Sequence, residues 1–161
     1  MPKSERPEQI HRPFIERVRE VFEGVPEGQG SWITSGGPEG GLNGSLAGLS
    51  AAQASRQLAG TTVAAHAEHV RWLVSKVNAF LRDEKPAMDW SESWAVTTVD
   101  EAAWNKLRTE LRKEGTELLA NIEKSQDWGG EAAANGAIST YGHIAYHLGA
   151  IRQLRKLTLA G

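Results

Sequence analysis

The chain has 161 residues, the size of one ordinary domain, and its 40% hydrophobic and 24% charged residues are typical of a folded globular protein. The formal net charge of -2 argues against a general affinity for nucleic acid, and the absence of cysteine excludes disulfides, thiolate zinc sites and a cysteine nucleophile. No apolar run has the length of a signal-peptide core or of a membrane span, so we expect one cytoplasmic domain over residues 1–161, with no membrane or nucleic-acid partner.

The first segment with helical spacing covers residues 7–24. Its apolar residues recur at three- and four-residue steps, at Ile10, Phe14, Val18, Val21 and Phe22. Residues 25–49 are rich in glycine and have no helical period, which predicts a long irregular connection. Because this stretch also carries apolar side chains, we expect it to lie across the helices. Ser50 is a candidate cap for a short helix through Leu58.

A second long helix is predicted at residues 61–83, where either threonine at the start can cap it. Its apolar seam follows the three-four repeat of packed helices, at Val63, His66, Val70, Leu73, Val77 and Phe80. His66 therefore falls within a stripe that is predicted to be buried. Residues 84–98 are predicted to form a crossover loop, and we expect Trp90 and Trp94 to anchor it by burial.

Two further helices are predicted at residues 100–124 and 137–157, joined by a Gly- and Ala-rich connection at residues 127–136. Asp100 is the candidate N-cap of the first of them. The other has an apolar seam at Ile144, His147, Leu148, Ile151 and Leu154, so a histidine again falls on a predicted buried face. No strand pattern competes. The expected fold is all-α, a four-helix bundle with long crossover loops.

Four of the five histidines form two close pairs, His66 with His69 and His143 with His147. Side chains at i and i+4 on a helix stand above one another, so His143 and His147 can offer nitrogens to one point. An unpaired imidazole at His66 would lose solvation in the seam, which favours a ligand role for it. His69 is the weaker candidate ligand, and otherwise a hydrogen-bond partner of a ligand or a general base acting on metal-bound water. The pairs predict a divalent metal site.

Other candidates are less specific. The pair at residues 143 and 147 does not belong to a zinc protease of the HExxH type, because Ile144 follows His143. Tyr146 is a candidate to orient a substrate or a metal-bound water through its hydroxyl, although a tyrosine on a bundle helix is more often a packing residue. His11 stands alone among charged neighbours, so we expect it to be solvated.

The segments TTVAAHAEHVRWLV, at residues 61–74, and GHIAYHLGAIRQL, at residues 142–154, lie on the predicted second and fourth long helices. In this order they resemble the DinB-like (DinB/YfiT) superfamily of metal-binding four-helix bundles, and the likeness spans most of the chain from about residue 50. The resemblance implies a divalent metal, often nickel or zinc, held by His143, His147 and one histidine of the second helix. His66 is the implied ligand, since His69 stands where many relatives carry an acidic residue.

Characterised members of that superfamily include transferases that use low-molecular-weight thiols such as bacillithiol or mycothiol, a maleylpyruvate isomerase, and proteins assigned only as metal-dependent hydrolases. Three neutral histidines would leave the metal its full charge, so that it lowers the pKa of a bound water or thiol. Because the chain has no cysteine, the thiol would be a cosubstrate. We therefore expect thiol-dependent S-transfer to a small-molecule substrate, with hydrolysis or a non-catalytic metal-stabilised binding module as alternatives. A homodimer is a further expectation from the relatives.

Overall fold

The computed structural model of this protein describes residues 6–125 and 131–160. The long helices are α1 (Arg6–Glu23), α4 (Val63–Leu81), α5 (Glu101–Lys124) and α6 (Glu131–Ala160), and the short elements are the helices α2 (Leu42–Leu46) and α3 (Ala51–Ala54) with the 3-10 turns η1 (Pro38–Gly40) and η2 (Glu92–Trp94). The described residues form no strand apart from an isolated antiparallel bridge between Leu58 and Thr61. The prediction of an all-α chain is confirmed.

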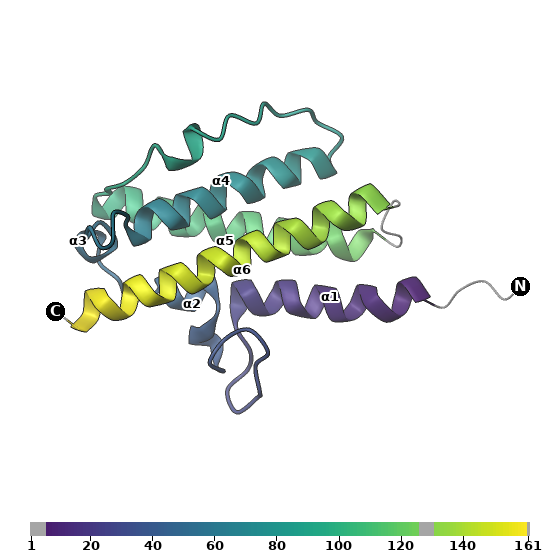
Figure 1. The fold of residues 1–161 in the computed structure, drawn as a ribbon, viewed down its shortest axis with the longest axis horizontal. Coiled ribbons are helices and arrows are strands. Elements are labelled where there is room, and N and C mark those ends of the chain that lie inside the picture. The colour runs from purple at the N-terminus through teal and green to yellow at the C-terminus, as the bar shows by residue number, and fades with distance from the viewer. Residues whose placement is uncertain (1–5, 126–130, 161) are drawn as a thin grey trace, which may run out of the picture.

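The four long helices lie along a common direction (Figure 1). Helices α4 and α5 pack against each other and run the same way, whereas α1 and α6 run the opposite way. Two helices that are parallel and consecutive need a connection that returns along their length. Residues 82–100 provide it, arching over α4 and carrying η2 back toward its beginning (Figure 1). The crossover loop formed by these residues therefore lies next to one face of α4.

Side-chain caps fix where three helices begin. The Thr62 hydroxyl accepts a hydrogen bond from the backbone N–H of Ala65 at 3.0 Å, and the Asp100 carboxylate accepts one from Ala103 at 2.7 Å. Ser50 forms a reciprocal capping box with Gln53 at the start of α3. These caps each satisfy N–H groups that have no partner inside the helix. The predicted starts of α3, α4 and α5 are therefore confirmed.

The short helix α3 ends at Ala54 and does not reach Leu58 as predicted. Ala59 and Gly60 both adopt positive φ, at 50° and 80°, in a tight turn. Hydrogen bonds between Leu58 and Thr61, of 2.9 and 3.1 Å, close this turn. A two-residue turn with both φ angles positive reverses the chain, and it leads directly into the cap of α4.

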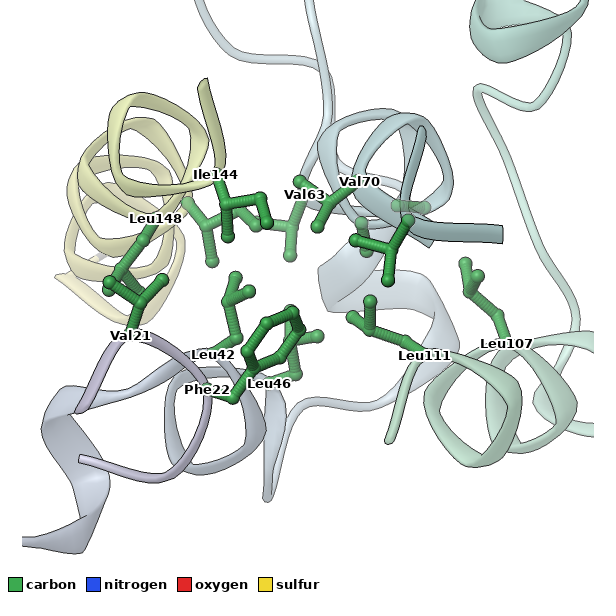
Figure 2. Close-up of a cluster of buried hydrophobic side chains, with 14 of the residues drawn as sticks. Val21, Phe22, Leu42, Leu46, Val63, Val70, Leu107, Leu111, Ile144 and Leu148 are labelled. Carbon is green, nitrogen blue, oxygen red and sulfur yellow. The ribbon is translucent and has the colours of Figure 1, made fainter. Parts of the chain in front are cut away.

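The glycine-rich stretch at residues 25–49 is more regular than predicted, because it contains η1 and α2. As expected, it lies across the helices: Leu42 and Leu46 are 0% and 1% exposed. Figure 2 shows both side chains pointing into the core from α2. Gly41 and Gly44 make this approach feasible, since a Cβ on either would come within 2.3 Å of backbone atoms of neighbouring segments.

All four long helices contribute side chains to one apolar core (Figure 2), namely Val21 and Phe22 from α1, Val63 and Val70 from α4, Leu107 and Leu111 from α5, and Ile144 and Leu148 from α6. Helix α5 approaches α1 closely at Gly115, where an added Cβ would lie 2.6 Å from the buried Phe22 ring. The close approach of α1 and α5 therefore requires a residue without a side chain at Gly115.

Helix α6 begins earlier than predicted. Residues 131–136 were expected to belong to a connection, but they form the first turns of α6, and alanine-rich sequence favours a helix there. Residues 127–130 of the predicted connection lie outside the described residues. Within the described ranges, no helix is both long and apolar enough to cross a membrane.

Candidate metal centre

The two histidine pairs meet at the contact between α4 and α6. His66 and His69 occupy successive turns of the inward face of α4, and His143 and His147 occupy successive turns of α6. His66, His69 and His147 are buried, with exposed fractions of 8%, 3% and 3%, and His143 is half-buried. The helical seams that the sequence predicts for these positions explain why imidazoles stand inside the protein.

Three of these histidines direct nitrogens toward a common point. The Nε2 atoms of His69 and His143 are 2.8 Å apart, and those of His143 and His147 are 3.0 Å apart. One ligand nitrogen from each of these residues lies within 4.8 Å of the other two. Nitrogens bound to a tetrahedral zinc at about 2.1 Å stand roughly 3.4 Å apart, so small outward movements would admit an ion. The trio can hold a metal.

His66 has a different position. Its Nδ1 lies 2.8 Å from Nδ1 of His147, on the side of that ring opposite Nε2. His66 is not a member of the convergent trio. The geometry therefore favours His69 as the ligand from α4, the reverse of the order that the sequence favoured. The reason is that His69, one turn after His66, is opposite the first histidine of the α6 pair.

Ser93 determines the tautomer of His69. The Ser93 hydroxyl donates its proton to the backbone carbonyl of Trp90 at 2.7 Å. Its oxygen can then only accept a hydrogen bond from Nδ1–H of His69, at 2.8 Å. His69 therefore carries its proton on Nδ1 and presents the lone pair of Nε2 to the other histidines. A hydrogen bond of this kind is what orients metal-binding imidazoles in proteins.

The other tautomers follow from this one. Since Nε2 of His69 is an acceptor, the facing Nε2 of His143 must carry the proton. Nε2 of His147 then accepts from the same N–H, and its Nδ1–H donates to Nδ1 of His66. One proton thus stands between three nitrogens. A cation could replace this proton if His143 moved its hydrogen to Nδ1.

The four clustered histidines are neutral near pH 7. Burial lowers the pKa of His66 and of His143. Burial, helped by the neighbouring His143 and His66, lowers the pKa of His69 to about 4, and burial with the other histidines nearby lowers the pKa of His147 to about 3. Crowded imidazoles in a buried site resist protonation because each charge would be poorly solvated and would repel the next. Neutral imidazole is the form that binds metals.

Tryptophans of the crossover loop cover this cluster. The Trp94 ring stacks on His69 with centroids 4.2 Å apart, and it meets His66 edge-on at 5.4 Å. Contrary to prediction, Trp90 and Trp94 do not anchor the loop by burial, because they are 46% and 41% exposed. The buried residue is Ser93, at 0% exposed. Its hydroxyl bonds to His69 of α4 and to the carbonyl of Trp90, so this buried serine ties the loop to α4 by a hydrogen bond, beside the stacking of Trp94 on His69.

Tyr146 lies at the edge of the cluster. Its ring meets the His147 ring edge-on at 5.0 Å, and the residue is 71% exposed. It is therefore not a packing residue, and its role in orienting a substrate stays a prediction. His11 is half-buried, with Nε2 3.0 Å from the carbonyl oxygen of Ile122, so the expectation that it is solvated is wrong. His11 belongs to the contact between α1 and α5, whereas the trio lies on α4 and α6.

An apolar cavity of about 340 Å³ lies between α1, α4, α5 and α6, and the four clustered histidines do not line it. Its lining includes Phe14, Phe22 and Phe80, and Thr140 and Tyr141 are the lining residues that carry a hydroxyl. The candidate metal site therefore lies at the contact between α4 and α6, under the crossover loop, and not in this cavity.

Comparisons with known proteins do not add to this picture: the chain matches no protein-family model, no curated protein and no solved structure. Membership of the DinB-like superfamily stays a prediction.

Proposed function

We propose that this protein is a divalent-metal protein of the DinB-like four-helix-bundle class, with His69, His143 and His147 as the ligands. The convergence of these three neutral, largely buried imidazoles carries the proposal. Imidazole nitrogen suits zinc and nickel, whereas magnesium and calcium prefer oxygen ligands. Nickel or zinc is accordingly the proposed ion.

The proposed chemistry is activation of a small nucleophile. A divalent ion on three neutral histidines keeps its charge and an open position, and so lowers the pKa of a bound water or thiol. The chain itself supplies orientation: Ser93 fixes the tautomer of His69, and Nδ1 of His66 accepts the Nδ1–H of His147. Trp94 stacks on the His69 ring and covers one face of that imidazole.

Thiol-dependent S-transfer to a small electrophile is the reaction we favour, with a low-molecular-weight thiol as cosubstrate. The absence of cysteine from the chain supports an external thiol. Hydrolysis by an activated water is the alternative that uses the same site. The test is product formation by the metal-loaded protein with a panel of thiols, bacillithiol and mycothiol included, and small electrophiles, beside an ester substrate without thiol.

The expected result is thiol-dependent conversion that disappears in His143→Ala and persists in His11→Gln, which removes a histidine outside the trio. Thiol-independent ester cleavage lost in His143→Ala would instead support hydrolysis. Equal rates in all three proteins would refute a catalytic role for the cluster.

A non-catalytic role is the second candidate, and the burial of His69 and His147 at 3% exposed favours it, because such a site can tie α4 to α6. Removal of the metal with a chelator distinguishes a catalytic ion from a structural one. A structural ion would raise the melting temperature strongly in a protein that has no activity with any thiol, electrophile or ester of the panel.

A further inference from the structure

Besides the apolar cavity, a polar cavity of about 230 Å³ lies between α2 and α5, two helices that carry none of the clustered histidines. It is lined by Asn43, Leu46, Ala47, Asn105, Arg108, Thr109 and Arg112. The lining contains two guanidinium groups and no carboxylate. Its volume exceeds that of several waters, at about 30 Å³ each, so it has room for a compact hydrated anion.

Arg108 and Arg112 are one turn apart on α5, which brings two positive charges to the same face. Like charges at this spacing destabilise a helix unless something neutralises them. Neither arginine forms an ion pair with a carboxylate of the described chain. Other arginines do: Arg71 lies 2.6 Å from Glu68, and Arg19 lies 2.6 Å from Glu123. The pair on α5 is therefore an uncompensated positive site.

The Arg108 side chain is held in place without a charge partner. Its guanidinium lies over the Trp104 ring, 5.6 Å from the centroid, and donates to the Asn105 side chain. Its Nε is buried and has no hydrogen-bond partner among the described residues. A buried donor without an acceptor is unfavourable, and an acceptor in the cavity would reach this N–H only if the Arg108 side chain shifted. A fixed guanidinium also loses less conformational entropy when it binds.

We propose that this cavity between α2 and α5 binds a phosphate group, in free phosphate or in a phosphomonoester. Guanidinium groups pair with phosphate oxygens through parallel N–H donors. A phosphate group carries a charge between about -1.5 and -2 at neutral pH, which balances the two arginines, whereas one carboxylate would balance only one of them. Asn43 of α2 and Asn105 of α5 add uncharged polar groups to the lining.

The test is calorimetric titration of the full-length protein with inorganic phosphate and with glycerol phosphate at constant ionic strength, with acetate as the carboxylate arm. The variants are Arg112→Gln, which removes an exposed charge of the cavity, and Lys113→Gln, which removes the neighbouring exposed charge outside it. We expect saturable phosphate binding to the wild type and to Lys113→Gln. Phosphate should bind Arg112→Gln at least about tenfold more weakly than it binds the wild type, and acetate should bind the wild type at least about tenfold more weakly than phosphate does. Tighter binding of glycerol phosphate than of inorganic phosphate would identify a phosphomonoester as the ligand.

Melting temperatures give a second readout. In phosphate-free buffer of low ionic strength, Arg112→Gln should melt no lower than the wild type, because it relieves the repulsion. Phosphate should raise the melting temperature of the wild type and of Lys113→Gln only. Equal phosphate effects on all three proteins, or no saturable binding to the wild type below about 10 mM, would overturn the proposal.

Discussion

At the residue scale, the candidate centre depends on hydrogen bonds that set the tautomer of each imidazole. Ser93 holds the proton of His69 on Nδ1, and His66 receives the proton of His147 on Nδ1. Both arrangements leave Nε2 as the atom that faces the trio. Residues that never touch the ion should therefore control how tightly it binds.

Ser93→Ala is expected to weaken metal binding by about 10- to 100-fold, because His69 loses the hydrogen bond that selects its tautomer. Competition titration with a chromogenic chelator measures this directly. Ser91→Ala is the matched control, since Ser91 is exposed on the same loop and bonds to Asp89 instead. Unchanged affinity in Ser93→Ala would show that its hydroxyl does not orient His69.

Glu20 makes a separate residue-scale prediction about pH. Burial alone would raise its pKa, but hydrogen bonds from Ser31 and Ile33, the charge of Arg17 and a hydrogen bond from Trp32 outweigh burial and leave the pKa below 4.5. A lowered pKa in the folded state contributes stability that is complete above pH 4.5 and is lost as the pH falls through the folded pKa.

Glu20→Gln should therefore lower the free energy of unfolding at pH 7 by about 2 kcal/mol and should reduce its dependence on pH between about 5 and 3. Urea unfolding at several pH values measures both effects. Glu16→Gln on the same helix, an exposed residue paired with Arg12, should change little. If the free energy of unfolding fell equally with falling pH in the wild type and in Glu20→Gln, the lowered pKa of Glu20 would not contribute to the acid dependence, which contradicts the prediction.

At the element scale, spacing of apolar residues predicted the long helices, because each buries one stripe against its neighbours. The start of α4 at Thr62 and that of α5 at Asp100 were predictable from cap residues. The helix α2 was not, since five residues are too few to show a period. Its buried Leu42 and Leu46 are recognisable only once the neighbouring helices are in place.

Gly115 illustrates the same limit within α5. By helix propensity alone a glycine in this position is only a mild weakness, whereas the structure places Phe22 against it. Gly115→Ala should destabilise the protein by about 1–3 kcal/mol through overpacking, despite the better helix propensity of alanine. The control is Gly149→Ala on α6, where an added Cβ meets nothing within 4 Å, and it should be stabilising by up to about 1 kcal/mol. Chemical unfolding of both variants decides, and a stabilised Gly115→Ala would contradict the packing argument.

At the scale of the whole molecule, the crossover loop determines what the histidines can do. The sequence placed the histidine pairs on buried faces of two helices, and the structure brings these faces together. The sequence favoured His66 over His69, whereas the geometry favours His69, because the choice depends on the axial offset of α4 against α6. The sequence also assigned no role to Ser93, which needs the return path of residues 82–100 to reach α4.

The central claim is that His69, His143 and His147 together bind one divalent ion. X-ray absorption spectroscopy of the untagged protein loaded with one equivalent of nickel or zinc counts the coordinated imidazoles most directly. We predict three imidazoles in the wild type, three in His66→Gln with weaker affinity, and two in His69→Gln. Fewer than three in the wild type, or the loss of one in His66→Gln while His69→Gln keeps three, would contradict the account.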